Sequence, residues 1–224
     1  FSDRRGEGNA LSNLGSVYHV FGDFHRAIKF YEQALLIARE IGDRCGEGAD
    51  LGNLGIVYKN LGETHRAIEF HEQHLCIARE VGDRHSESMA LGNLGNAYLD
   101  LNETQRAIDY NEQDLAIARE IGDRHGEGIA LGNLGLVFAT LGETHRAIEF
   151  YKQNLVIARE IGDRHGEATV LFNLSLAMDE LGDRTQAIVY AETALEFFKQ
   201  IESPNNKVVL EQLREWRSEY LSRD

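Results

Sequence analysis

The chain has 224 residues, with 37 acidic and 23 basic side chains and a formal net charge of −14. This balance argues against a nucleic-acid partner, because phosphate neutralisation needs clustered Lys and Arg. Only two cysteines occur, without disulfide or zinc spacing, and no apolar run approaches the roughly 18 residues of a membrane span. We therefore expect a cytoplasmic protein that does not insert into a membrane.

One short string recurs along the chain. Leu-Gly-Asn-Leu-Gly stands at 51–55, 91–95 and 131–135, with looser copies at 11–15 and 171–175, in steps of 40 residues. A fixed period of this size is the signature of a repeat solenoid, in which each unit stacks only on its neighbours. The sequence therefore predicts one elongated array rather than a globular core.

Each repeat predicts two helices. In the first repeat, apolar side chains recur at steps of three and four residues over about 5–21, and Gly22 ends that helix. The second helix runs over about 24–41 and ends at Gly42. Asp43 is placed to cap the next helix by accepting hydrogen bonds from its first amides. The same Gly-Asp pair returns at 82–83, 122–123 and 162–163.

These elements predict an all-α fold, a right-handed α-solenoid of five antiparallel helix pairs. The repeats cover about 3–42, 43–82, 83–122, 123–162 and 163–202. Ser203 caps a last helix that begins near Pro204. We expect residues 203–224 to cover the last repeat with apolar side chains at helical spacing: Val209, Leu213, Trp216 and Tyr220.

The N-terminal end has no comparable cover. The chain begins with Phe1 instead of methionine, and residues 1–4 align with residues 41–44. We expect a fragment of a longer protein from which upstream repeats have been removed.

Glycines within the first helices oppose helix formation. Gly92 and Gly95 together cost about 2 kcal/mol relative to alanine. We expect close helix packing to offset this cost. Surface ion pairs three residues apart are expected on the second helices: Arg66 with Glu69, Arg106 with Asp109, and Arg146 with Glu149.

The repeat resembles the tetratricopeptide repeat family over about residues 3–202. The family pattern matches Leu54, Gly55, Tyr58, Gly62, Ala67 and Phe70 and their equivalents in the other repeats. A repeat longer than 34 residues resembles the subclass of Pins-type adaptors and kinesin light chains. The last part of the chain is similar to the C-terminal arrays of bacterial STAND-type signalling ATPases. The resemblance implies a protein-binding scaffold and not an enzyme.

Two known binding modes of this family can be compared with the sequence. Chaperone-tail clamps use Lys, Asn and Arg at positions that correspond to Ser12, Ser16, Gly52, Ile56, Gly92, Asn96, Gly132 and Leu136. Pins-type adaptors present arginines from a position that corresponds to Asn9, Ala49, Met89, Ile129 and Thr169. None of these residues is basic, so we do not expect a strongly acidic peptide as the partner.

The repeated asparagine is the candidate binding residue. Its amide both donates and accepts, so a row of asparagines on the first helices, which line the concave surface in this family, can hold a peptide backbone. Apolar neighbours on the same helices would anchor side chains. The predicted groove residues are Asn13, Asn53, Asn93, Asn133, Asn173, Asn96, Met89, Ile129, Ile56 and Leu136. The alternative is that each asparagine bonds a neighbouring helix and fixes the stacking.

Other polar residues carry simpler interpretations. His85, His125 and His165 occupy one repeat position, but helix axes about 8–10 Å apart cannot share zinc ligands at about 2 Å. A second position holds His74, Asp114 and Asn154, which suggests partial exposure. No triad-like set and no Gly-x-x-x-x-Gly-Lys phosphate loop recurs. We expect no metal, no cofactor and no catalysis.

The sequence therefore predicts a protein-interaction module that binds a peptide-like segment of a protein partner in its concave groove. Two alternatives stay open. The array could be the ligand-sensing arm of a bacterial STAND-type ATPase. It could also be a self-assembling element that forms a homo-oligomer through its uncapped first repeat.

Overall fold

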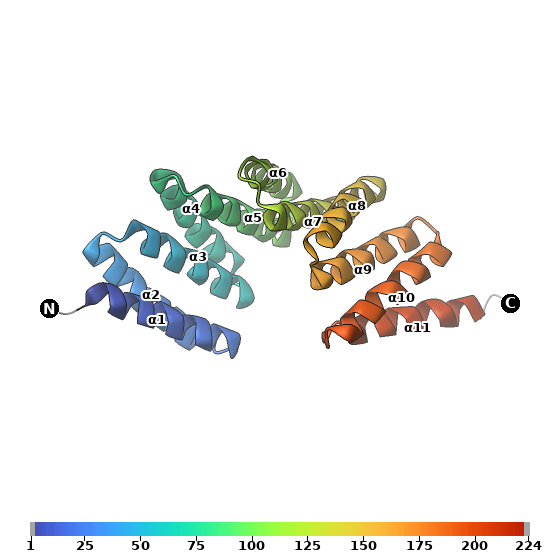
Figure 1. The fold of residues 1–224 in the computed structure, drawn as a ribbon, viewed down its shortest axis with the longest axis horizontal. Coiled ribbons are helices and arrows are strands. Elements are labelled where there is room, and N and C mark those ends of the chain that lie inside the picture. The colour runs from blue at the N-terminus through green and yellow to red at the C-terminus, as the bar shows by residue number, and fades with distance from the viewer. Residues whose placement is uncertain (1–2, 222–224) are drawn as a thin grey trace. The chain divides into compact units, whose positions relative to one another are not determined.

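The structure, a computed structural model, describes residues 3–221, with side chains described to Ser218. Eleven α-helices and no strand lie in this range (Figure 1). They are α1 Arg4–Val20, α2 Phe24–Ile41, α3 Arg44–Asn60, α4 Thr64–Val81, α5 Arg84–Asp100, α6 Thr104–Glu120, α7 Arg124–Thr140, α8 Thr144–Ile161, α9 Arg164–Glu180, α10 Arg184–Gln200 and α11 Asn206–Leu221. The predicted all-α fold is confirmed, and the first predicted helix lies within one residue of its observed bounds.

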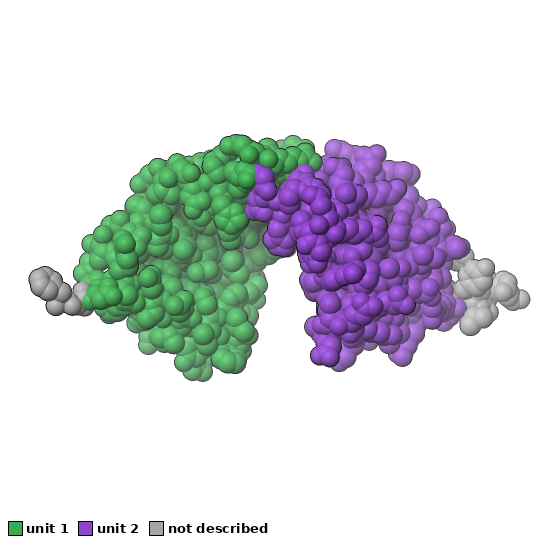
Figure 2. Space-filling model, in the orientation of Figure 1, with its two compact units in different colours: residues 1–121 green, residues 122–224 purple. Residues whose placement is uncertain are grey.

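The helices pack as consecutive pairs, α1 on α2 through α9 on α10. They belong to two compact units, residues 1–121 and residues 122–224 (Figure 2). The first unit holds three helix pairs, and within it α2 and α4 also pack on the first helix of the next pair. The second unit holds two pairs and α11, with α8 packed on α9 and α10 packed on α11. The predicted solenoid of helix pairs with a final covering helix is therefore confirmed.

The turns follow the predicted chemistry. Gly42 ends α2 in the left-handed region at φ 70°, where a side chain would be strained. Asp43 then caps α3, because its carboxylate accepts a hydrogen bond of 3.1 Å from the backbone N–H of Gly46. Asn102 has φ 59° at a position that holds glycine in neighbouring repeats, and asparagine tolerates this region better than most residues.

The glycines of the repeated string allow the two helices of a pair to approach closely. A Cβ atom on Gly55 would lie 2.4 Å from the ring of His71, and one on Gly135 would lie 2.4 Å from the ring of Tyr151. Both rings are buried. The leucines before Gly55 in the string, Leu51 and Leu54, are also buried in the core between helices. Close packing thus accounts for glycine inside these helices, as predicted.

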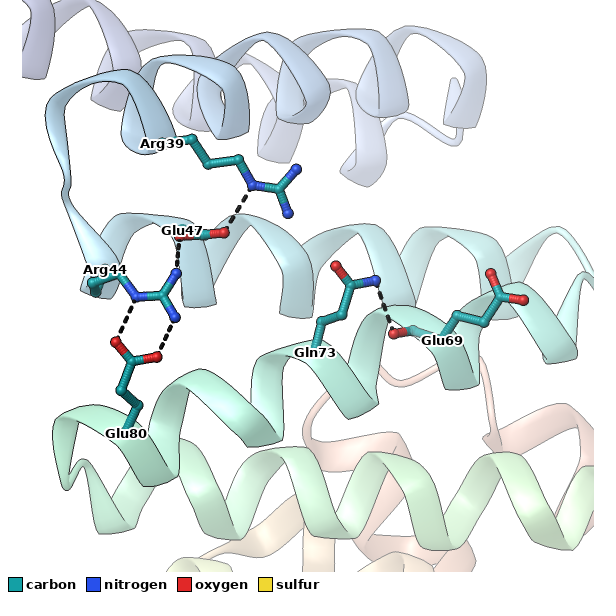
Figure 3. Close-up of polar contacts among 6 residues, drawn as sticks. All are labelled: Arg39, Arg44, Glu47, Glu69, Gln73 and Glu80. Atoms are coloured by element: carbon teal, nitrogen blue, oxygen red, sulfur yellow. Dashed lines mark hydrogen bonds and ion pairs between the residues drawn. The ribbon is translucent and has the colours of Figure 1, made fainter.

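A ladder of ion pairs joins successive repeats within each unit, and Figure 3 shows the set around Glu47. Arg39 of α2 donates to Glu47 of α3 over 2.8 Å, and Arg44 bonds the other oxygen of the same carboxylate. Arg44 also contacts Glu80 of α4, with a 3.0 Å bond from its Nε atom. The side chain of Glu47 is only 8 % exposed, so a nearly buried carboxylate is matched by two arginines. The same arrangement returns around Glu87 and Glu167.

The predicted ion pairs between each arginine and the acidic residue three positions after it are wrong. Arg66 bonds Glu63, three residues before it, at 2.9 Å instead of Glu69. Its guanidinium lies 4.0 Å from the ring centre of Tyr58, which is itself stacked on Phe70. The arginine is drawn back by this cation–π contact. Arg106 with Glu103 and Arg146 with Glu143 repeat the arrangement.

The last helix covers α10 as predicted, although its start differs. Val209, Leu213 and Trp216 are buried. Ser203 accepts a 3.3 Å hydrogen bond from the N–H of Asn205, and α11 begins only at Asn206, past the predicted start near Pro204. The side chain of Tyr220 lies outside the described residues.

Candidate functional site

The predicted groove residues all lie on the first helices of their pairs, α1, α3, α5, α7 and α9. Within a helix they stand four and seven residues after the first one, as Ile129, Asn133 and Leu136 do in α7, so they form one stripe. Their apolar members are solvent-accessible, with Met89 50 % and Ile129 49 % exposed. The stripe therefore faces away from the core leucines.

Four of the five repeated asparagines make no side-chain hydrogen bond to a neighbouring helix in the described residues. In the part of the chain that the structure describes, the side-chain amides of Asn13, Asn53, Asn93 and Asn173 form no hydrogen bond to another residue. Asn13 is exposed and the other three are half-buried. Asn133 is also half-buried, and its side chain does interact with another residue.

In the second unit, a pocket of about 430 Å³ lies between α7 and α9 and is floored by α8. It brings together four predicted residues: Ile129, Asn133, Leu136 and Asn173. Ile157 and Ile161 of α8 line it too, so its base is apolar. The sequence-based prediction missed these two isoleucines because it placed groove residues on the first helices alone.

In the first unit, a pocket of about 360 Å³ occupies the equivalent place between α1 and α3, floored by α2. Asn13 and Asn53 line it, as their equivalents line the pocket of the second unit. The other predicted residues of this unit, Ile56, Met89, Asn93 and Asn96, line neither of these two pockets. They lie on the accessible stripes of α3 and α5.

Asp50 is the residue of this first pocket that sequence reasoning missed. It is 3 % exposed and accepts a 2.5 Å hydrogen bond from the hydroxyl of Ser12. Burial raises the pKa of the Asp50 carboxyl to about 6. A signal was present, because the equivalent positions in the other repeats hold small or apolar residues: Ala10, Ala90, Ala130 and Val170.

The expected partial exposure of the polar second-helix position is wrong for two of its three residues. His74 is 5 % exposed and Asp114 4 % exposed. Each fills the space that a glycine leaves on the partner helix: a Cβ on Gly52 would lie 2.9 Å from His74, and one on Gly92 would lie 2.7 Å from Asp114. Asn154 is half-buried and lines the second unit's pocket.

The repeated histidines belong to no cluster of potential metal ligands in the described residues. Among residues 3–221, no cluster of three or more His, Cys, Asp or Glu side chains is arranged to hold a metal ion. His125 and His165 are exposed residues at the rim of the α7–α9 pocket. None of the helices described is long and apolar enough to cross a membrane.

The repeat pattern also identifies the family. The sequence model of the tetratricopeptide repeat matches residues 6–80, 49–120, 88–155 and 126–200, which together span most of the chain. This is a tetratricopeptide repeat protein. The predicted family resemblance is confirmed, and the fold of this family is generally a non-catalytic protein-interaction module.

Solved structures with the same fold come from several kinds of tetratricopeptide repeat protein. A putative kinesin light chain repeat protein of Podosopora anserina is 18% identical, with a TM-score of 0.72, covering 90% of this chain and 99% of that one. The STAND protein with a tetratricopeptide repeat sensor from Pyrococcus horikoshii is 19% identical, with a TM-score of 0.79, over 96% of this chain and 35% of that one. At these identities the likeness shows the fold alone.

A third structure is a Rap protein complexed with competence and sporulation factor. It is 16% identical to this tetratricopeptide repeat protein, with a TM-score of 0.72, over 100% of this chain and 67% of that one. Comparison with curated protein sequences gives no significant match.

Proposed function

We propose that this tetratricopeptide repeat protein binds a peptide-like segment of a protein partner on the stripe formed by its first helices. One observation carries the proposal: each unit has a pocket between consecutive first helices, and asparagines of two successive repeats line it. Asn13 and Asn53 do so in the first unit, and Asn133 and Asn173 in the second.

The chemistry of these pockets suits a peptide. An asparagine amide can donate to a backbone carbonyl and accept from a backbone N–H, so it holds the main chain without selecting a side chain. In the second unit, Ile129 and Leu136 with the apolar floor of α8 would receive a hydrophobic side chain. Orientation would come from the amides and affinity from the apolar anchor.

The charge of the stripe limits which kinds of peptide can bind. The positions at which related proteins bind acidic peptides hold no basic residue in this chain. A strongly acidic segment would therefore meet no counter-charge there, and the net charge of −14 would oppose its approach. The complex of a Rap protein with competence and sporulation factor supports the proposal, because a protein of the same fold is complexed with a partner.

The proposal is tested with peptides selected from a displayed random library on the intact chain. Replacing Asn133 and Asn173 together by alanine removes both amides of one pocket. Each lost hydrogen bond is worth about 1 kcal/mol, so losing two should lower the affinity roughly 30-fold. The free energy of unfolding should change by less than about 1 kcal/mol. Calorimetry of the selected peptide measures the first quantity and urea unfolding the second.

The matched control for this pair is Val156→Ala. Val156 is 62 % exposed on α8 and is absent from the pocket lining. Its replacement should leave peptide affinity unchanged. Unaltered binding in the double asparagine variant, or collapse of its stability, would contradict the role given to the amides.

A second candidate function, self-association, is favoured by the outer face of α1. Leu14 is 43 % and Val17 48 % exposed on α1. Pairing of this face with the same face of a second copy would bury both patches. Sedimentation should then detect dimers that Val17→Asp abolishes, and monomers at all accessible concentrations would remove this candidate.

A third candidate, the sensor arm of a signalling ATPase, rests on the shared fold of the STAND protein from Pyrococcus horikoshii. A phosphate-binding loop encoded upstream in the same gene would favour it. A gene without such a loop would exclude it.

A further inference from the structure

The two pockets are built alike but differ in chemistry. Each residue lining the pocket of the first unit has a counterpart 120 residues later in the pocket of the second unit. Asp50 corresponds to Val170, and Asn9 corresponds to Ile129. The pocket between α1 and α3 therefore carries one acidic side chain, Asp50, that its counterpart in the second unit lacks.

Asp50 is a buried carboxylate with only part of its bonding capacity used. One oxygen accepts the hydrogen bond from Ser12, and no other residue in the described part of the chain bonds the carboxylate. It is 3 % exposed and lines the pocket. Its unused acceptor capacity is therefore available to a group that enters the pocket.

The arginine that lines this pocket does not pair with Asp50. Arg5 also lines the pocket, but its Nε atom pairs with Asp43 at 3.2 Å. On the α2 side, Tyr31 donates to or accepts from Ser16 and supplies no charge. One arginine thus faces two carboxylates, and the pocket keeps one unmatched negative charge.

Resting on the proposed peptide-binding function, we infer that the α1–α3 pocket takes a lysine or arginine side chain of the bound segment, with Asp50 as its counter-charge. The donor would complete the bonding of Asp50, and the aliphatic part of the side chain would pack on Ile37 and Ile41 of the pocket floor. The partner would then carry a basic residue for the first unit and an apolar residue for the second.

The energetics favour this assignment over a structural role. A carboxylate buried without a cation destabilises its surroundings, and the pKa of Asp50, raised to about 6, records that cost. The equivalent alanines at positions 10, 90 and 130 fill the same place in the helix without it. The stacking of the repeats therefore does not require the acid.

The first test reads Asp50 directly on the intact chain. The ¹³C signal of its carboxyl group is followed by NMR while acetyl-lysine methylamide is added, with acetyl-norleucine methylamide as the uncharged match. We expect a saturable shift with the lysine probe alone, together with a lowered pKa of Asp50, because a bound cation favours the ionised carboxylate. Equal responses to both probes, or none to either, would overturn the inference.

The second test uses peptides selected on the intact chain. Wild-type protein should enrich peptides with lysine or arginine at one position, and Asp50→Asn should lower their affinity about tenfold or more, since a charge-assisted hydrogen bond is lost. Asp50→Val, which copies the second unit's pocket, should remove the enrichment for basic residues. The pocket around Val170 in the same chain serves as the internal reference, because it lacks the acid in every variant.

The outcomes separate this inference from the proposed function. If peptide binding requires Asn133 and Asn173 but the selected peptides show no preference for basic residues, the inference about Asp50 fails. The proposed peptide-binding function is then still supported. If the lysine probe binds Asp50 while no displayed peptide is selected, the pocket stands and the peptide function fails. Asp50→Ala, which copies the natural alanines of other repeats, guards against a variant that misfolds.

Discussion

The pair Gly135 and Tyr151 shows how single residues set the distance between the helices of a repeat. The Tyr151 ring is 2 % exposed and occupies the place where a side chain on Gly135 would stand. In the fifth repeat the sizes are reversed, with Ser175 at the glycine position and Ala191 at the tyrosine position. A larger residue at the glycine position thus accompanies a much smaller residue at the tyrosine position.

Gly135→Ala should destabilise the protein although it improves helix propensity. The propensity gain is about 1 kcal/mol, whereas overpacking against a fixed ring costs about 1–3 kcal/mol. With the new Cβ only 2.4 Å from the ring, we expect a net loss of about 1 kcal/mol in urea unfolding.

The control combines Gly135→Ala with Tyr151→Ala, which imitates the natural pair of the fifth repeat. Tyr151→Ala alone should cost about 3–5 kcal/mol through the cavity it leaves. In the double variant the added methyl group no longer clashes, so the combined loss should be smaller than the sum of the two single losses. Strict additivity would show that the two residues do not share one space.

His71 predicts a pH dependence of stability. It is fully buried, and both ring nitrogens have no hydrogen-bond partner. Burial lowers the pKa of His71 to about 3. Below pH 6.5 the His71 side chain binds a proton in the unfolded chain but not in the folded chain. The folded state therefore keeps its full free energy of unfolding above pH 6.5 and loses part of it as the pH falls. From pH 6.5 to 5 this loss is roughly 2 kcal/mol.

His71→Asn should remove this dependence. Asn111 stands at the same position in the next repeat and donates a 2.8 Å hydrogen bond to the carbonyl of Ala107, so asparagine satisfies itself there. We expect the variant to gain stability relative to the wild type by roughly 2 kcal/mol between pH 6.5 and 5, measured by urea unfolding. Parallel pH profiles would contradict the assignment.

At the scale of the helix, the ion-pair ladder fixes how one repeat meets the next. Glu47 is held by Arg39 from the preceding helix and by Arg44 from its own (Figure 3). Glu47→Gln keeps the shape of the side chain and removes the negative charge with which both arginines pair. Because both arginines are partly exposed and screened by water, we expect a loss of only about 1–2 kcal/mol in urea unfolding.

The same repeat position in α1 supplies the matched control. The side chain of Glu7 is 49 % exposed and pairs with Arg4. Glu7→Gln should therefore leave the unfolding midpoint nearly unchanged. Equal effects of the two substitutions would mean that burial of the carboxylate does not decide the strength of the ladder.

At the scale of the whole molecule, the two compact units should be separable in unfolding. Trp216 is the only tryptophan and is buried in the second unit, so its fluorescence reports that unit. Far-UV ellipticity reports all helices. Repeat arrays lose cooperativity when one part is weakened, so Gly135→Ala should move the fluorescence transition to lower urea than the ellipticity transition.

Gly55→Ala is the counterpart in the first unit, where the new Cβ would lie 2.4 Å from the His71 ring. It should shift part of the ellipticity transition and leave the Trp216 fluorescence midpoint in place. Coincident transitions in both variants would show that the chain unfolds as one cooperative body.

The sequence alone determined the family, the helix pairs and their ends. A 40-residue period, glycines at the turns and aspartates before the first helices are local signals, because periodicity and capping act over a few residues. The same period located the stripe that carries Asn133 and its equivalents. These features can be predicted without knowing which helices pack against each other.

Only the tertiary structure decided which polar residues are buried and what they face. His74 and Asp114 are enclosed because glycines on the partner helix leave room for them, and Asp50 meets Ser12 from a helix 38 residues earlier. Arg66 turns back to Glu63 because an aromatic ring lies beneath it. Such outcomes depend on contacts between helices, which a pattern read along one helix does not contain.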